Sequence, residues 1–158
     1  MLVLALLVAF IAWLLVKLVG EPVLKYRSIL GDLHACLMFN ANVIFNPGVA
    51  EDLKDEARAS KIKQIQDTQQ RLRSYASELS SYRVRILGYH WLTKTRLVPG
   101  EDDLDEAVMA LVGISNSLGH LPTGMLITKT EEWVGTVKEN LDLYPSKVDW
   151  RSFLPTKG

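Results

Sequence analysis

The sequence lacks most of the features that mark an enzyme or a secreted protein. It has one cysteine, Cys36, and no Asn-x-Ser/Thr sequence, which excludes an intrachain disulfide and an N-linked glycan. The sequence also lacks the common nucleotide-binding, hydrolase and metal-binding motifs: Gly-x-Gly-x-x-Gly, Gly-x-x-x-x-Gly-Lys-Ser/Thr, Gly-x-Ser-x-Gly, Cys-x-x-Cys and His-x-x-x-His. Its three histidines are far apart in the chain. We therefore expect no enzyme activity, no cofactor and no metal site, and we interpret Cys36 as a small buried residue.

Charge is missing from the start of the chain. The first sixteen residues carry no charged side chain, and Lys17 alone interrupts the apolar run that follows. About nineteen helical residues span about 28 Å, close to the thickness of a hydrocarbon core. A cleaved signal peptide and a buried core helix are the weaker interpretations, because no basic residue precedes the run. Since Lys17, Lys25 and Arg27 follow it, we expect residues 1–20 to anchor the protein in a bacterial inner membrane, with the C-terminal domain in the cytoplasm.

The net charge is zero, but the charges are segregated along the chain. Residues 58–96 contain nine basic residues and two acidic ones, and acidic groups lie on either side, at 51–56 and 101–106. The simplest interpretation is a solvated helix surface paired with these acids, and the group at 101–106 also suits the first turn of a helix. The functional interpretations are contact with anionic lipid headgroups, or binding of a soluble anion such as a cyclic oligonucleotide by several subunits. A neutral chain without a reading motif argues against duplex DNA as a partner.

Four arginines of this basic stretch lie among tyrosines, which would add stacking surface to positive charge. These candidate ligand-binding residues are Arg71, Arg73, Arg83 and Arg85. Arg71 and Arg73 point to different faces of a helix, so the basic residues do not form a single ridge.

The ordered parts of the sequence all have the periodicity of helices, which predicts the all-α class. We expect a transmembrane anchor over 1–20, an apolar second helix over 21–47 that starts at Pro22, a cytosolic helical domain over 48–145 and a tail over 146–158. Within the domain we expect helices over about 50–85, over 103–118 and from the capping box Thr128-x-x-Glu131 to about 143, with a connection over 86–100.

Two segments leave alternatives open. Residues 33–45 are apolar nearly all round, which fits a core helix better than a shallow second membrane segment that would make the protein a hairpin. The long helix carries a narrow apolar seam, formed by Ile65, Leu72, Ala76 and Leu79. This seam suits packing on the second helix or self-association, and we expect a homo-oligomer.

Three stretches, residues 28–48, 71–79 and 111–118, together resemble a group of small bacterial proteins with an N-terminal membrane segment and a helical cytosolic domain. The resemblance implies this architecture and no particular chemistry. In plan and size the chain is also similar to a class of membrane effectors from type III CRISPR antiphage systems, which are gated by cyclic oligoadenylate. This second resemblance assigns no role to any residue of the chain.

The resulting hypothesis is a non-enzymatic, oligomeric membrane effector or sensor. Its cytosolic domain would bind an anionic signal, with a cyclic oligonucleotide as the candidate, and would alter the membrane in antiviral defence. The alternatives are a passive membrane-tethered scaffold or lipid-binding interaction protein, and an enzyme whose site has no recognised motif.

Overall fold

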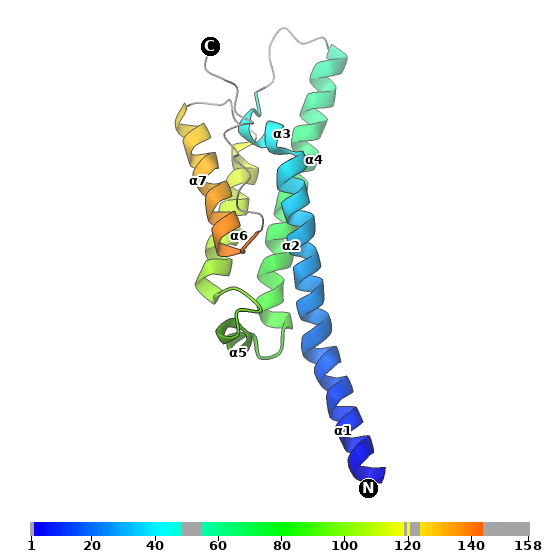
Figure 1. Ribbon diagram of the computed structural model, residues 1–158. Coiled ribbons are helices and arrows are strands. Elements are labelled where there is room, and N and C mark those ends of the chain that lie inside the picture. The colour runs from blue at the N-terminus through cyan, green and yellow to red at the C-terminus, as the bar shows by residue number, and fades with distance from the viewer. Residues whose placement is uncertain (1, 49–54, 119, 121–123, 144–158) are drawn as a thin grey trace.

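The computed structural model describes residues 2–48, 55–118, 120 and 124–143 of the chain. Every regular element in these ranges is a helix, which confirms the all-α class. Figure 1 shows helices packed side by side in a bundle, and one helix that extends well beyond the bundle toward the N-terminus.

The extended helix is built from three elements that follow one another without a break: α1 (Leu2–Leu15), the π-helical turn η1 (Val16–Gly20) and α2 (Glu21–Phe39). Pro22 lies in the first turn of α2, as expected, but α2 continues the preceding helix instead of starting separately. Proline has no N–H to donate, and its ring clashes with the carbonyl one α-helical turn earlier. The turn before Pro22 is wider, because the Glu21 N–H donates to the Val16 carbonyl, and the helix continues through it.

In the described part of the chain, one helix is long and apolar enough to cross a membrane. This helix, Val3–Phe39, lies near the N-terminus. Its side chains over residues 3–18 are all exposed. Lys17, at the end of the apolar run, pairs with Glu21 one turn further on. The part of this helix before Lys17 is apolar on every face, and such a surface is normally covered by lipid or by the interior of a large protein.

The bundle itself consists of α2, α4 (Asp55–Arg85), α6 (Glu101–Ser117) and α7 (Gly124–Asn140). Helix α4 packs against α2 and α6, and α6 packs against α7. Two short helices, α3 (Ala41–Phe45) and α5 (Tyr89–Lys94), lie at opposite ends of the bundle (Figure 1). The core includes Leu33, Leu37, Ile44, Leu72, Leu79, Leu104, Leu111, Ile114, Val134 and Val137.

Both apolar segments that left alternatives open contribute buried side chains to the core of the bundle. Leu33, Leu37 and Ile44, from residues 33–45, are among the most deeply buried side chains, as a core helix requires. The four residues of the seam on α4 are buried as well. The seam therefore has a partner within the same chain, and self-association remains a prediction.

Three expectations about the C-terminal half need correction. Helix α7 begins at Gly124, so Thr128 is not its cap, and the Thr128 hydroxyl donates to the Gly124 carbonyl at 3.1 Å. The connection over 86–100 contains the helix α5. Helix α6 begins at Glu101, two residues earlier than expected, with three acidic residues in its first turn. The expected tail over 146–158 lies outside the described residues.

Candidate functional site

The four arginines expected to bind a ligand lie on different sides of α4. Arg73 faces α6, where its Nε donates to the Ser115 hydroxyl at 3.0 Å and its Nη2 to the Asn116 side-chain oxygen at 3.1 Å. Arg83 also faces α6, and its Nη1 lies 2.9 Å from a carboxylate oxygen of Asp105. Two of the four cations are therefore engaged in contacts between helices of the bundle.

The other two arginines are far from each other along the same helix. Burial raises the pKa of the Tyr75 phenol, and the nearby Arg71 charge opposes that rise. In the last turn of α4, burial raises the pKa of the Tyr82 phenol, and the Arg85 charge opposes it. Fourteen residues of helix separate Arg71 from Arg85 by about 21 Å. Within one chain the four arginines thus do not converge on a single anion.

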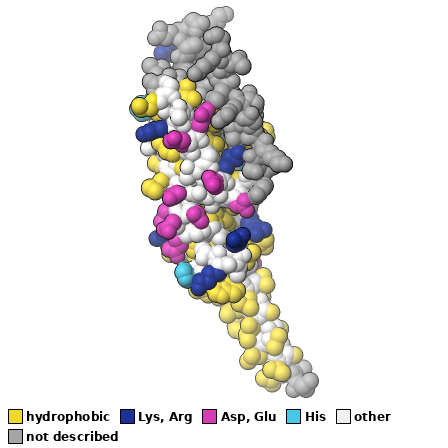
Figure 2. All heavy atoms as spheres, turned by 60° about the vertical axis from the view of Figure 1, so that its left-hand side comes forward, with side chains coloured by type: hydrophobic (Ala, Val, Ile, Leu, Met, Phe, Trp, Pro, Cys, Tyr) yellow, Lys and Arg dark blue, Asp and Glu magenta, His cyan; other side chains and the backbone are white. Residues whose placement is uncertain are grey.

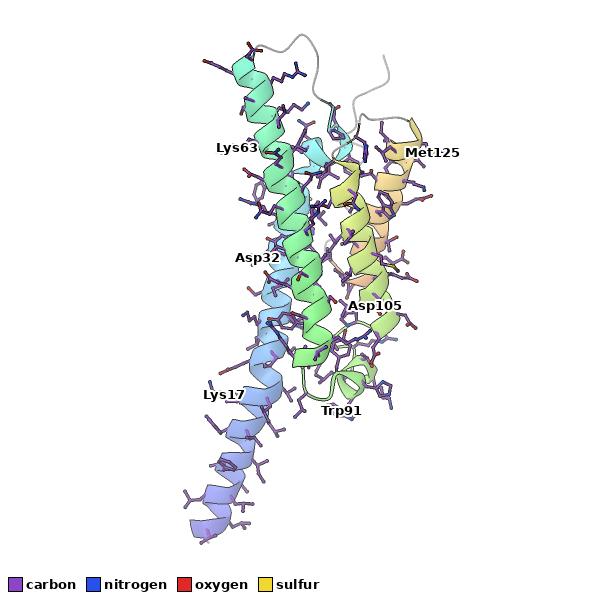
Figure 3. The ribbon with its side chains drawn as sticks, turned by 180° about the vertical axis from the view of Figure 1, so that it is seen from behind. Lys17, Asp32, Lys63, Trp91, Asp105 and Met125 are labelled. Carbon is purple, nitrogen blue, oxygen red and sulfur yellow. The ribbon has the colours of Figure 1, made fainter. Side chains whose placement is uncertain are left out.

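The structure instead gathers exposed apolar side chains around α5. Gly88, in the left-handed region with a φ of 74°, allows the sharp turn from α4 into this helix. The exposed fractions are 87% for Val84, 63% for Leu87, 65% for Trp91 and 41% for Leu97. We call these four residues the α5 tip. Figure 3 places Trp91 close to the level of Lys17, at the end of the bundle where the apolar helix leaves it.

Basic side chains accompany the α5 tip. Arg85, Lys94 and Arg96 lie within the same stretch of chain and are exposed. Figure 2 shows acidic side chains spread over one face of the bundle, and basic side chains with a histidine close to the apolar helix. An exposed apolar patch bordered by cations is typical of a surface that contacts an anionic partner or a lipid headgroup layer.

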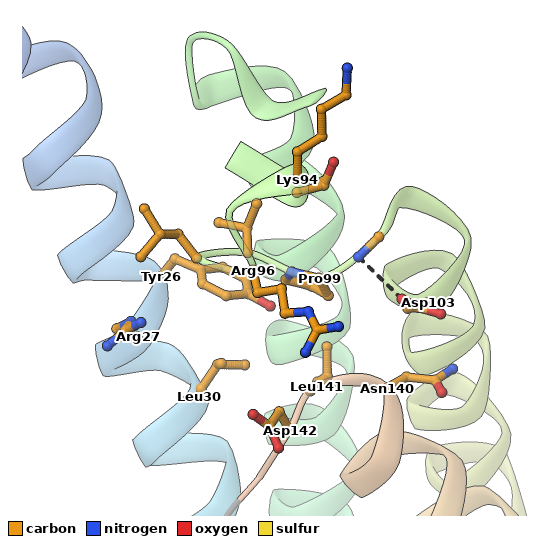
Figure 4. A pocket seen from close by; sticks show the side chains of 14 residues that line it. Tyr26, Arg27, Leu30, Lys94, Arg96, Pro99, Asp103, Asn140, Leu141 and Asp142 are labelled. Carbon is orange, nitrogen blue, oxygen red and sulfur yellow. Dashed lines mark hydrogen bonds between the residues drawn. The ribbon is translucent and has the colours of Figure 1, made fainter. Parts of the chain in front are cut away.

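A cavity of about 820 Å³ lies beside the α5 tip. It is formed by α2, the segment 93–100, the start of α6 and the end of α7 (Figure 4). Its charged lining residues are Arg27, Lys94, Arg96, Asp103 and Asp142. One carboxylate oxygen of Asp103 accepts a hydrogen bond from the Gly100 N–H at 3.2 Å, which caps the start of α6 at the edge of the cavity.

The wall of this cavity contains an unusual polar group. Tyr26 is 1% exposed, and its hydroxyl has no hydrogen-bond partner within the part of the chain that the structure describes. Its ring is held in place by the Tyr82 ring, at a centroid distance of 5.8 Å. In Figure 4 the Tyr26 hydroxyl points into the cavity, toward Arg96 and Pro99. A buried hydroxyl without a partner is rare in proteins, and it requires an explanation.

The remaining candidate chemistry is structural. Cys36 is buried, as expected, and the Asn40 amide donates to its sulfur at 3.6 Å. The same Asn40 accepts a hydrogen bond from Thr68 at 3.2 Å, which ties the end of α2 to α4. Over the described ranges, no group of three or more histidine, cysteine, aspartate or glutamate side chains could hold a metal ion.

Comparisons with protein-family models, with curated proteins and with solved structures found no match for this chain. Of the site residues that the structure reveals, Trp91, Lys94 and Arg96 could be recognised in the sequence as one basic and aromatic stretch. Tyr26 carries no such signal, because only the fold brings it beside Arg96.

Proposed function

We propose that this protein is a membrane-anchored, non-enzymatic helical protein whose bundle docks on the anionic surface of the membrane that holds its N-terminal helix. Residues 1–20 span a bacterial inner membrane, and the bundle lies on the cytoplasmic side. This orientation follows from the basic residues after the apolar run, because such residues are enriched on the cytoplasmic side of membrane helices. The observation that supports docking is the position of the α5 tip, which lies at the same end of the bundle as the apolar helix (Figures 1 and 3).

The chemistry of the α5 tip suits a lipid interface. Tryptophan has a large apolar ring and one N–H donor, and it is enriched where apolar chains meet water. Basic residues near an anionic bilayer each contribute about 1 kcal/mol, so Arg85, Lys94 and Arg96 together supply about 3 kcal/mol. Because the anchor already holds the bundle at the surface, this modest energy is sufficient to orient it.

This function corresponds to the lipid-binding alternative from the sequence. The cyclic-oligonucleotide effector requires an anion site built from Arg71, Arg73, Arg83 and Arg85, and two of these are engaged by α6. The arrangement of the four arginines in one chain therefore does not favour this effector. Three claims remain predictions: binding of a nucleotide signal, oligomerisation and a role in antiviral defence.

The test measures how deep α5 lies in the membrane. The full chain, with Cys36→Ala, receives a nitroxide label at His90→Cys in α5 or, as the matched control, at Lys63→Cys near the opposite end of α4. Both positions are exposed, and Figure 3 shows Lys63 far from Trp91. The proteins are placed in nanodiscs of phosphatidylcholine with one quarter phosphatidylglycerol.

We expect the label at position 90 to collide more often with oxygen, which concentrates in lipid, than with a water-soluble nickel chelate. The label at position 63 should show the reverse. Replacement of Trp91 by serine, or of Lys94 and Arg96 by glutamine, should move the label at position 90 toward water. Equal nickel access at both positions would refute docking, and recovery of the full chain in the soluble fraction of cells would refute the anchor.

A further inference from the structure

The cavity beside the α5 tip has the size and the mixed lining of a ligand site. Its volume of about 820 Å³ lies within the range of small-molecule sites, which is roughly 300–1,000 Å³. Apolar side chains of Leu30, Leu97, Val98 and Leu141 form part of the lining, beside the charged residues. Such a lining suits a ligand with an anionic head and an apolar portion.

The charges of the lining favour an anion that also carries donor groups. The lining includes three cations, Arg27, Lys94 and Arg96, and two carboxylates, Asp103 and Asp142. In Figure 4, Lys94 lies at the edge of the cavity nearest the earlier turns of α2, whereas Asp142 lies at the opposite edge. Arginine binds phosphate oxygens through its planar set of donors, and a carboxylate accepts hydrogen bonds from hydroxyl or ammonium groups.

The unpartnered Tyr26 hydroxyl identifies where an acceptor is missing. A phenol can donate one hydrogen bond, and the hydroxyl points into the cavity beside the exposed Arg96 side chain (Figure 4). A phosphate oxygen placed between Tyr26 and Arg96 would accept from both. This would also explain why a buried donor is retained at this position without an internal partner.

Two helix ends with left-handed backbone meet at the same cavity. Among the described residues, the non-glycine residues with positive φ are Arg96, at 57°, and Asp142, at 50°. Both line the cavity, although 46 positions of sequence separate them. Both residues follow the last turn of a helix, α5 or α7, and the next N–H in the chain donates back to the helix, from Leu97 to the Leu92 carbonyl at 3.3 Å and from Leu143 to the Lys138 carbonyl at 3.0 Å. The left-handed backbone thus closes each helix and fixes where Arg96 and Asp142 enter the cavity.

From these observations we infer that the cavity binds the phosphate headgroup of a phospholipid, with Tyr26 and Arg96 on the phosphate and Arg27 at the edge of the cavity. Lys94 lies at the entrance nearest the membrane, and Asp142 accepts from a hydroxyl or ammonium group of the headgroup. The inference rests on the proposed function, because membrane docking is what brings the cavity to the headgroup layer. The protein would thus hold one particular lipid beside its anchor.

The experiment measures lipid retention by the full chain. The protein is released from mixed micelles that contain equal amounts of phosphatidylcholine, phosphatidylethanolamine and phosphatidylglycerol, and native mass spectrometry counts the lipids that remain bound. Since micelles have no flat surface on which to dock, this measurement is independent of the depth of α5. We expect the wild-type chain to retain one phosphatidylethanolamine or phosphatidylglycerol in preference to phosphatidylcholine, whose headgroup has no donor for Asp142.

The most informative variant is Tyr26→Phe. It removes only the hydroxyl that lacks a partner, so the melting temperature should stay the same or rise, while lipid retention falls at least about tenfold, as expected for a lost hydrogen bond to a charged group. Arg96→Gln should reduce retention by at least the same factor. Arg58→Gln, an exposed change near the start of α4, is the matched charge control and should retain lipid as the wild type does.

Three outcomes would overturn the inference. The first is a wild-type chain that retains no phospholipid, and the second is unchanged retention in both Tyr26→Phe and Arg96→Gln. The third is displacement of the lipid by millimolar sn-glycerol 3-phosphate, which would assign the cavity to a soluble phosphate ester. If the label at position 90 is exposed to water while these variants still lose lipid, the cavity assignment holds and the docking proposal fails.

Discussion

Two glycines in the middle of bundle helices offer a matched test of how closely α6 and α7 pack. Gly113 lies in α6, and a Cβ added there would sit 2.8 Å from Cε2, 2.9 Å from Cδ2 and 3.0 Å from Cζ2 of Trp133 in α7. Gly135 lies in α7, and a Cβ added there would meet nothing within 4 Å. The perturbation is Gly→Ala at each position in turn.

The expected effects have opposite signs. In a helix interior, alanine is more favourable than glycine by about 1 kcal/mol, and both variants gain this amount. Carbon atoms pack best at about 3.5–4.0 Å, so the Cβ at position 113 requires the indole of Trp133 to move by nearly 1 Å. Overpacking of this kind costs about 1–3 kcal/mol. Gly113→Ala should therefore leave stability unchanged or lower it by up to about 2 kcal/mol, whereas Gly135→Ala should raise it by up to about 1 kcal/mol.

The assay is thermal unfolding of the full chain in detergent micelles, followed by circular dichroism. For a protein of this size, 1 kcal/mol shifts the melting temperature by about 2–4 °C, so the two variants should differ by about 2–12 °C. Replacement of Trp133 by leucine in the Gly113→Ala background should recover most of the loss, because the smaller side chain leaves room for the Cβ. Equal melting temperatures for the two single variants would refute the close packing of α6 on α7.

Two further outcomes test the polar contacts of the bundle. Ser115→Ala should lower the free energy of unfolding by about 1–3 kcal/mol in the same assay, because the buried hydroxyl accepts from Arg73 at 3.0 Å and donates to the Gln69 carbonyl at 3.3 Å. The control is Ser80→Ala, an exposed change that should cost about 0.5 kcal/mol or less. Equal losses in the two variants would contradict this. Burial, and then the charge of Glu101, raises the pKa of Tyr89 to about 12, so the folded state holds this proton more tightly than the unfolded state. Stability should therefore fall as the pH rises from about 10 to about 12. In the Tyr89→Phe variant the fall should be shallower, because other tyrosines whose pKa is raised by burial, such as Tyr75 and Tyr82, still contribute to it; an equal slope in the two proteins would contradict this.

The sequence predicted the helices that bury a regular apolar stripe. The seam of Ile65, Leu72, Ala76 and Leu79 is buried along α4, because a side chain every three or four residues can only face one side of a helix. The apolar N-terminal run was equally clear, since composition and length decide whether a helix can cross a membrane. Both signals are local and do not depend on what the helix packs against.

Helix boundaries were less predictable, since different backbone geometries compete at the ends. Pro22 normally marks the start of a helix, but a π turn lets the helix pass through it. The six-residue helix α5 is too short to show a period, and it was expected to be a connection. The pattern Thr128-x-x-Glu131 resembles a cap, yet α7 already begins at Gly124.

The candidate site was the least predictable part, because it depends on long-range placement. The sequence showed that Arg71 and Arg73 point to different faces, but not that α6 would engage Arg73 and Arg83. The cavity brings Tyr26, Arg96 and Asp142 together from three distant segments, and no spacing in the sequence relates them. A buried hydroxyl without a partner can be recognised only when all of its neighbours are in place.

Membrane docking and lipid binding are linked, because the height of the cavity above the membrane decides whether a headgroup can enter it. Residues 3–20 of the long helix reach about 27 Å, nearly the thickness of a hydrocarbon core, so a helix that spans the membrane as we propose would leave the core close to Gly20. Arg27 lies seven residues further on, about 10 Å above that level, whereas the headgroup layer is only roughly 5–8 Å thick. An upright bundle would therefore hold its cavity just above the lipid phosphates. Because Trp91 lies close to the level of Lys17, below Gly20, the α5 tip would already reach the apolar core in an upright bundle, and a tilt of the bundle toward the surface about this contact would bring the cavity to the headgroups.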